Sequence, residues 1–198
     1  MIKLIFATNN QHKVDEMQVA VGKKIEVVSL KEAGIDIDIP EPFDTLEENA
    51  EEKARVINEL TNENCFSEDT GLEVDSLNGE PGVKSARYAG EDKSFDKNVD
   101  KLLSKLGTST NRSARFRTII TLIWNGNRHN FEGICEGTIL SGRKGSKGFG
   151  YDPVFQPSGS DKSFAEMDHE EKNEYSHRRK AADKLIMFLK EQTNAVVN

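Results

Sequence analysis

Residues 3 to 13, with the sequence KLIFATNNQHK, decide the fold that we predict for this chain. Apolar residues of strand type fill Lys3–Ala7, a polar loop follows, and Gln11–Val21 has apolar residues at helical spacing. A second strand is predicted at Ile25–Ser29. The order strand, loop, helix and strand is typical of an α/β fold, in which ligands favour the crevice at the carboxyl ends of the strands.

The next segment contains the clearest helix signal of the sequence. It follows a connector rich in proline and acidic residues, Ile35–Asp44, and the helix is predicted from Leu46 to about Leu60. Thr45 and Glu48 have the spacing of a capping box, which satisfies free N–H groups of the first helical turn. This capping function accounts for Glu48, so we do not include it among the candidate metal ligands.

Two further elements are predicted in the second half of the chain. A long hairpin is indicated by three neighbouring segments. Side chains of strand type alternate over Arg115–Trp124, Asn125-Gly126 supplies a turn signal, and a second strand follows at Phe131–Ile139. After a glycine-rich loop, an amphipathic helix is predicted over roughly Arg178–Glu191. The last residues, Asn194–Asn198, are expected to fray.

Length and composition restrict the class of protein. The chain has 198 residues, a formal net charge of −7, 31% charged residues and 35% hydrophobic residues, which predicts a single globular domain over residues 1–198. No apolar run approaches the roughly 20 residues of a membrane-spanning helix, and the N-terminus lacks a signal-peptide pattern. We therefore expect a cytoplasmic protein without a membrane partner. The negative charge argues against a nucleic-acid partner, for which a basic stripe is expected.

The loop Thr8-Asn9-Asn10-Gln11-His12-Lys13 is the first candidate for a binding site. It leads into the start of a helix, where free N–H groups and the helix dipole favour an anion, and Lys13 adds a positive charge. The glycine-rich P-loop pattern is absent, so a P-loop mechanism is not implied. The alternative is that Asn9 or Asn10 only caps the helix and that Lys13 is solvated.

A lysine lies where the helix that begins at Leu46 is expected to be apolar. At about 100° per residue, Lys53 falls in the middle of the apolar stripe of this helix. That stripe consists of Leu46, Ala50, Ile57 and Leu60. Because an unpaired buried charge is unfavourable, Lys53 must pair with a carboxylate, face a bound anion or extend its ammonium to solvent.

Three carboxylates are candidates for metal binding. Glu68 and Asp69 begin the segment Glu68-Asp69-Thr70-Gly71-Leu72, which we place at the end of a strand. Two carboxylates beside a glycine at a strand end suit Mg²⁺ that is held by side chains, phosphate oxygens and water, and one carboxylate can deprotonate that water. Glu41, between two prolines in a rigid connector, is the third candidate. The alternatives are a turn with adjacent acids and a surface carboxylate.

The segment Gly148–Pro153 combines two aromatic residues and an acid in a glycine-flanked turn. Phe149 and Tyr151 can stack on a nucleobase, and Asp152 can accept hydrogen bonds from the edge of that base. The alternative is a structural turn that is anchored by its aromatic residues.

The segment Lys172–Arg178 contains a conflict of helical geometry. In one unbroken helix, Arg178 would project about 100° or more away from the face shared by its polar neighbours. A helix that restarts near Ser176 would instead direct His177, Arg178 and free N–H groups toward one ligand. The alternative is a solvated, basic helix start.

Together, six segments resemble the inosine triphosphate pyrophosphatase family. They are Thr8–Lys13, Glu48–Ala54, Glu68–Leu72, Pro81–Tyr88, Gly148–Pro153 and Lys172–Arg178. One such motif would have little specificity, whereas six in the same order over nearly the whole chain are specific. The family often has small residues where Gln11 and His12 stand, and the surroundings of Glu41 vary.

The resemblance implies Mg²⁺-dependent hydrolysis of non-standard purine nucleoside triphosphates, namely ITP, dITP and XTP. Cleavage between the α- and β-phosphates would release a monophosphate and pyrophosphate and would cleanse the nucleotide pool. The resemblance also implies a homodimer and an α/β fold with an elongated, two-lobed mixed sheet, flanking helices and a central substrate cleft. Donors directed at O6 of the base would disfavour adenine, because its amino group would leave buried polar atoms unpaired.

The resemblance further implies roles for single residues. Asp69 is implied as the catalytic base, and Glu41, Glu68 and Asp69 as ligands of Mg²⁺. The residues implied in substrate binding are Thr8, Asn9, Asn10, Gln11, His12, Lys13, Lys53, Thr70, Arg87, Phe149, Gly150, Tyr151, Asp152, Lys172, His177 and Arg178. Two other functions are compatible with the residues: a non-catalytic nucleotide-binding module, and a metal-dependent phosphatase that removes only the terminal phosphate.

Overall fold

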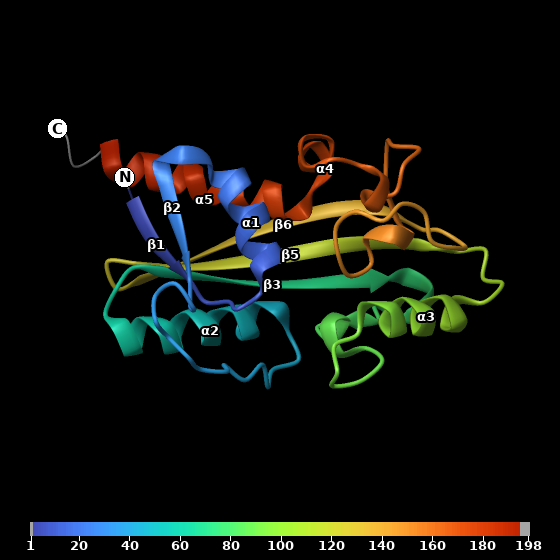
Figure 1. The fold of residues 1–198 in the computed structure, drawn as a ribbon, viewed down its shortest axis with the longest axis horizontal. Coiled ribbons are helices and arrows are strands. Elements are labelled where there is room, and N and C mark those ends of the chain that lie inside the picture. Colours follow the sequence, from blue (N-terminus) through green and yellow to red (C-terminus); the bar gives the residue numbers. More distant parts are fainter. Residues whose placement is uncertain (1, 195–198) are drawn as a thin grey trace. The chain divides into compact units, whose positions relative to one another are not determined.

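The computed structural model describes residues 2–194 and has a mixed α/β fold (Figure 1). In these residues a seven-stranded sheet has the order β2-β1-β3-β5-β6-β7, and β4 pairs with β3. The strands are β1 (Ile2–Phe6), β2 (Ile25–Ser29), β3 (Cys65–Val74), β4 (Pro81–Gly82), β5 (Ser113–Trp124), β6 (Asn127–Ile139) and β7 (Phe155–Pro157). The helices are α1 (Gln11–Val21), α2 (Leu46–Thr61), α3 (Phe95–Leu106), α4 (His169–Tyr175) and α5 (His177–Asn194). A mixed sheet flanked by helices confirms the predicted fold class.

The chain forms two compact units. Unit 1 consists of Met1–Asp69, Thr118–Gly133 and Arg178–Asn198, and unit 2 consists of Thr70–Arg117 and Ile134–His177. The strands β3, β5 and β6 contribute residues to both units. No helix within residues 2–194 combines the length and the apolar character that crossing a membrane requires.

The first elements of unit 1 have the predicted order of strand, loop, helix and strand. β1 and β2 pair in parallel, with Ile2 opposite Ile25 and Phe6 opposite Ser29. Parallel neighbours need a crossover connection, which α1 provides. Asn10 caps this helix, because its side chain accepts a hydrogen bond from the His12 N–H at 3.1 Å.

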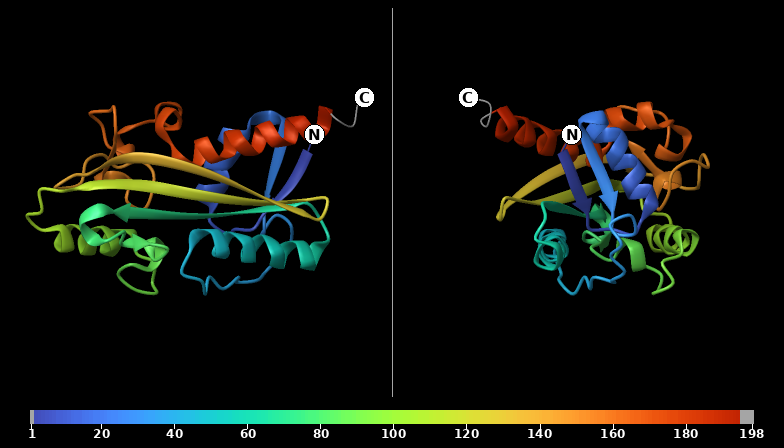
Figure 2. Two further views of the ribbon diagram at one scale, coloured as in Figure 1. Left: turned by 180° about the vertical axis from the view of Figure 1, so that it is seen from behind. Right: turned by 60° about the vertical axis from the view of Figure 1, so that its left-hand side comes forward.

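Helices cover both faces of the sheet within unit 1. α1 and α5 lie on one face and α2 on the other (Figures 1 and 2). Ile120 and Leu122 of β5 belong to the cluster that includes α1 and α5, whereas Ile123 packs with Ile57 of α2. Side chains on both faces of this part of β5 are therefore buried. The alternating direction of its side chains does not separate a buried face from a solvent-exposed face.

The strand that carries the predicted metal ligands differs from the prediction. The sequence predicts a strand end at Glu68–Gly71, but β3 continues without a break from Cys65 to Val74. Cys65 pairs with β1, and Leu72 pairs with β4. Pairing on both sides of Gly71 keeps this segment extended, since a glycine weakens a strand without ending it. The two carboxylates therefore lie within a strand.

A break between two helices resolves the geometric conflict near Arg178. α4 ends at Tyr175 and α5 begins at His177, with Ser176 between them at φ −56° and ψ 127°. The predicted restart near Ser176 is confirmed. The helix α5 reaches Asn194. Fraying is predicted for Asn194–Asn198, and the residues after Asn194 lie outside the described part of the chain.

Unit 2 has its own core around aromatic rings. Phe116 of β5 contacts Phe155 of β7, with ring centroids 4.7 Å apart, and Phe155 lies 5.2 Å from Phe164. α3 contributes buried apolar residues, among them Leu102, to the same cluster. The predicted glycine-rich loop passes close to this core: a Cβ on Gly145 would lie 2.3 Å from the Ala165 carbonyl oxygen, so only glycine fits there.

Candidate functional site

Unit 1 collects charged side chains from segments that are far apart in the sequence. They are Lys13 and Glu16 of α1, Glu41 of the connector, Lys53 of α2, Glu68 and Asp69 of β3, and Arg178 of α5. We call these residues the charged cluster. Most of its side chains are largely buried, and buried charges are unfavourable unless they are paired. Ion pairs connect its members.

Lys53 joins two of the predicted metal ligands. Its Nζ donates hydrogen bonds to Glu41 Oε1 at 2.6 Å, to Asp69 Oδ1 at 2.8 Å and to the Glu68 carbonyl oxygen at 2.9 Å. Only 6% of Lys53 is exposed. Of the three environments that the sequence allows for this lysine, pairing with carboxylates is the one found.

The position of Lys53 follows from close packing of α2 against β3. Ala50 and Ala54 are fully buried, and their small side chains let the helix approach the strand. Ser67 Oγ donates to the Ala50 carbonyl, and Cys65 Sγ donates to the Ala54 carbonyl at 3.3 Å. These contacts place Lys53, next to Ala54 in the sequence, beside the two carboxylates that follow Ser67.

The connector that carries Glu41 is attached to α2 by Asn49. The Asn49 Nδ2 donates to the Phe43 carbonyl at 2.9 Å, and its Oδ1 accepts from the Phe43 N–H at 3.0 Å. Thr45 caps the same helix by accepting a hydrogen bond from the Glu48 N–H at 3.2 Å. The cap and the amide contacts hold residues 43–45 at the start of α2, two residues after Glu41.

Glu68 is held by two cations. Arg178 donates from Nε to Oε2 at 2.6 Å and from Nη2 to Oε1 at 2.8 Å, and Lys13 Nζ lies 3.3 Å from Oε1. Arg178 Nη1 also pairs with Glu16. The structure thus places Arg178 against a predicted metal ligand within unit 1. Glu16 was not predicted, although its position three residues after Lys13 puts both side chains on one face of α1.

Burial shifts the proton affinities of this cluster. Burial raises the pKa of Asp69 above its ordinary value; Lys53 and Lys13 oppose this shift, and Glu41 adds to it. Burial alone would lower the pKa of Lys53, but Asp69 and Glu41 outweigh it and raise that pKa. The shift favours the charged form of Lys53 and increases the proton affinity of Asp69, and proton affinity is what a general base requires.

The oxygens of the cluster are suited to a hard divalent cation. Glu41 and Asp69 place one carboxylate oxygen each within 2.8 Å of the Lys53 ammonium, which stands between them as a cation would. Carboxylate oxygens are the protein ligands that Mg²⁺ prefers. Within residues 2–194 no three acidic, histidine or cysteine side chains form a ready-made metal site. The carboxylate oxygens of Glu41 and Asp69 therefore fit Mg²⁺, but the Lys53 ammonium lies between them.

The first loop contains the helix cap that its sequence allows. Thr8 Oγ1 accepts from the Asn10 N–H at 3.1 Å, and Asn10 caps α1. Lys13 is not merely solvated, because it pairs with Glu68. Asn9, Gln11 and His12 are exposed.

A second group of predicted residues meets in unit 2. Lys172 Nζ donates to Asp152 Oδ2 at 2.7 Å, and both side chains are at most 7% exposed. The same carboxylate oxygen accepts from the Phe149 N–H at 3.0 Å, and the Lys172 ammonium lies 5.5 Å from the centroid of the Phe149 ring. His177 stacks on Phe116, with centroids 4.6 Å apart. These residues form a compact arrangement of aromatic rings and polar groups.

The remaining predicted residues of unit 2 have different environments. Tyr151 is buried and its hydroxyl donates to the Ser85 carbonyl at 2.8 Å, so this group stabilises the unit. Arg87 pairs with the exposed Glu91 at 3.2 Å. Thr70 is half-buried in β3, and Gly150 has a positive φ of 63°.

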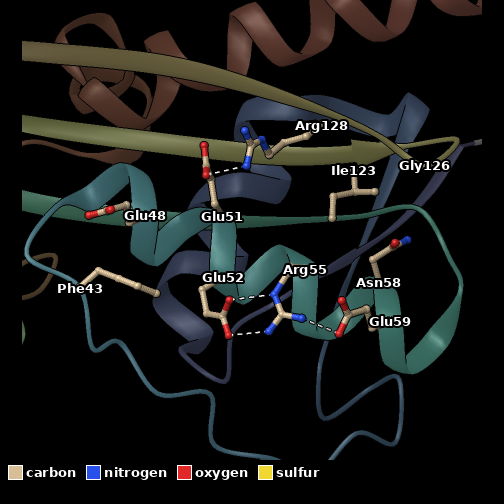
Figure 3. Close-up of a pocket in the computed structure, with 10 residues that line it drawn as sticks. All are labelled: Phe43, Glu48, Glu51, Glu52, Arg55, Asn58, Glu59, Ile123, Gly126 and Arg128. Carbon is tan, nitrogen blue, oxygen red and sulfur yellow. Dashed lines mark hydrogen bonds and ion pairs between the residues drawn. The ribbon is translucent and has the colours of Figure 1, made fainter.

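A cavity of about 700 Å³ in unit 1 lies outside these predicted residues (Figure 3). It is lined by Phe43, Glu48, Glu51, Glu52, Arg55, Asn58, Glu59, Ile123, Gly126 and Arg128. Ion pairs join part of its charged lining: Arg55 pairs with Glu52 and Glu59, and Arg128 pairs with Glu51 (Figure 3). None of the predicted site residues lines this cavity.

Comparisons with known proteins agree with the resemblance noted in the sequence. The chain is 52% identical over 190 residues to a dITP/XTP pyrophosphatase of Porphyromonas gingivalis, with 96% of this chain and 98% of that protein covered. It is 48% identical over 188 residues to a dITP/XTP pyrophosphatase of Flavobacterium johnsoniae, with 95% and 98% covered.

A solved structure gives the same result. The Ham1 protein of Staphylococcus aureus superposes with a TM-score of 0.87 at 40% identity, with 96% of this chain and 99% of that chain covered. A sequence profile of the Ham1 family matches residues 4–188. The chain belongs to the Ham1 family.

Proposed function

We propose that this chain hydrolyses ITP, dITP and XTP between the α- and β-phosphates and releases a monophosphate and pyrophosphate. The observation that carries the proposal is the contact of Lys53 with Glu41 and Asp69, in which a carboxylate of raised pKa lies among cations. The names of the relatives, dITP/XTP pyrophosphatase, support dITP and XTP as substrates.

In this proposal the charged cluster binds the phosphate chain and activates water. Asp69 accepts the proton of the attacking water, since its raised pKa makes it a better base than an ordinary aspartate. Lys13 and Lys53 contact phosphate oxygens, with N–H groups of the first loop beside them. Arg178 holds Glu68 in a fixed orientation through two hydrogen bonds.

We propose Mg²⁺ as the cofactor, with Glu41, Glu68 and Asp69 as its ligands. Their carboxylate oxygens fit this ion, and Lys53 already brings a positive charge between two of them. When bound, Mg²⁺ would neutralise phosphate charge and lower the pKa of a bound water.

The residues of unit 2 are proposed to bind the base. Phe149 offers an aromatic face, and the buried ion pair of Asp152 with Lys172 offers a donor and acceptors for a 6-oxo purine edge. Adenine would leave part of this polar set unpaired, so the proposal predicts discrimination against ATP. The homodimer and the cytoplasmic location stay predictions.

The test is product analysis after incubation with ITP and Mg²⁺. We expect inosine monophosphate and pyrophosphate in equal amounts. Orthophosphate and inosine diphosphate would instead identify a terminal phosphatase, and binding without turnover would identify a nucleotide-binding module. A competition assay with ITP, dITP, XTP and ATP then ranks the substrates.

Two variants assign the chemistry to the charged cluster. Asp69→Asn should abolish turnover and preserve measurable binding of ITP, because it removes the base and keeps the shape. Glu59→Gln, which alters an exposed carboxylate on α2 outside the cluster, is the control and should keep full turnover. Turnover that persists in Asp69→Asn would refute the assignment of the base.

A further inference from the structure

The contacts of Lys53 conflict with its proposed role at the phosphate chain. Its ammonium donates to Glu41 Oε1, the Glu68 carbonyl and Asp69 Oδ1, at 2.6, 2.9 and 2.8 Å. An ammonium has three N–H donors, so no donor is left for a phosphate oxygen. Lys53 can reach the phosphate chain only after it releases at least one of these oxygens.

The same oxygens would have to turn toward a metal. Glu41 and Asp69 are two of the three proposed Mg²⁺ ligands, and in the structure each gives a carboxylate oxygen to Lys53. The third proposed ligand, Glu68, is engaged by Arg178 and Lys13. The metal ligands are therefore neutralised by protein cations, and a divalent cation that arrives alone must compete with them.

The charge balance of the cluster disfavours a metal without a phosphate chain. Among the described residues of the cluster, four carboxylates face three cations, which leaves one net negative charge. A divalent cation alone would create an excess of positive charge next to Lys53, and repulsion is strong where water is largely excluded. A triphosphate supplies the negative charge that balances both the divalent cation and Lys53.

We infer that Lys53 is an exchangeable cation that holds Glu41 and Asp69 together in the nucleotide-free protein and moves to the phosphate chain when metal and triphosphate bind. This inference rests on the proposed function. Lys53 then makes the free divalent cation a weak ligand and couples its binding to that of the triphosphate. Such coupling is reciprocal, so each ligand raises the affinity of the other.

The first experiment measures Mn²⁺ binding to the nucleotide-free protein by electron paramagnetic resonance. Lys53→Met removes the competing charge and should bind Mn²⁺ at least about tenfold more tightly than the wild type, which corresponds to about 1.4 kcal/mol. Lys53→Arg keeps the charge and should bind Mn²⁺ as weakly as the wild type. If circular dichroism shows that Lys53→Met does not fold, Lys53→Gln, which is neutral and polar, replaces it.

Lys172→Met is the matched control. Lys172 is also 6% exposed and also pairs with a carboxylate at 2.7 Å, but its partner is Asp152. This variant should leave Mn²⁺ affinity unchanged. Equal tightening in Lys172→Met would show a general effect of net charge and would overturn the inference, as would equal or weaker Mn²⁺ binding by the neutral variants of Lys53.

The second experiment measures coupling with linear tripolyphosphate, which has the phosphate chain without a nucleoside. The wild type should bind the preformed Mn²⁺–tripolyphosphate complex more tightly than free Mn²⁺, and Lys53→Met should reduce this preference at least about tenfold. A wild type without any preference would overturn the inference. Neither measurement includes turnover. A result that overturns the inference about Lys53 therefore does not contradict ITP hydrolysis, and Mn²⁺ binding can be interpreted even if ITP is not hydrolysed.

Discussion

Two ion pairs of unit 1 have the same geometry and differ in burial. Arg178 binds Glu68 through Nε and Nη2 at 2.6 and 2.8 Å, and Arg55 binds Glu52 through the same atoms at 2.8 and 2.7 Å. The Glu68 and Arg178 side chains are 0% and 4% exposed, whereas those of Glu52 and Arg55 are 27% and 51% exposed. Glu68→Gln and Glu52→Gln therefore remove the same charge from two different environments.

We expect a large difference in the free energy of unfolding. Removing one partner of a buried pair destabilises by about 3–5 kcal/mol, because the other charge stays buried. Glu68→Gln should fall near the lower end, about 3 kcal/mol, since glutamine keeps the volume and Glu16 still pairs with Arg178. Glu52→Gln should lose about 0–1 kcal/mol, as exposed pairs do. The melting temperature should fall by roughly 6–12 °C for Glu68→Gln and by at most about 4 °C for Glu52→Gln.

Urea denaturation followed by circular dichroism measures both variants. The midpoint should shift and the slope of the transition should stay constant, because neither substitution changes the surface that unfolding exposes. Equal losses in the two variants, or a loss below about 1 kcal/mol for Glu68→Gln, would refute the reasoning that burial decides the contribution of these pairs.

Three more predictions follow from single residues. A Cβ on Gly148 would lie 2.0 Å from Asp152 Oδ2, at a φ of +74°. Gly148→Ala should therefore lower the free energy of unfolding by about 1–2 kcal/mol and raise KM for ITP. Gly142→Ala is the control and should change neither quantity, because no atom lies within 4 Å of its Cβ. Burial raises the pKa of Cys65 to about 12, so this thiol should not react with a disulfide reagent at pH 8 until urea unfolds the protein; rapid reaction of the native protein would contradict this. Burial also raises the pKa of Asp69, so in metal-free protein its carboxyl should take up a proton at a higher pH than an ordinary aspartate, as a carbon NMR titration can show; a lowered pKa would contradict this.

Local patterns predict much of unit 1. The order of strand, loop and helix up to Val21 depends on periodicity and on the cap at Asn10, which are properties of neighbouring residues. The misfit of Lys53 in an apolar stripe correctly predicts that this charge needs a special environment. The helical geometry near Arg178 correctly predicts a break at Ser176.

Contacts between distant segments are not predictable in this way. The continuation of β3 through Gly71 depends on pairing with β1 and β4, which the local sequence does not encode. The pair of Arg178 with Glu16 joins α5 to α1, so no spacing within either helix indicates it. The sequence shows that Lys53 needs a partner, but only the packing of α2 on β3 decides which carboxylate it meets.

The two faces of α2 carry charged side chains in different environments. Its outward face carries Arg55 with Glu52 and Glu59, whose side chains are 27% and 63% exposed, an arrangement that solvent screens and that contributes little to stability. Its inward face carries Lys53, buried against Glu41 and Asp69. Well-packed apolar residues could replace such a buried set without loss of stability, so folding alone does not require it. In the proposed function, the ligand of opposite charge that accounts for Lys53 is the triphosphate.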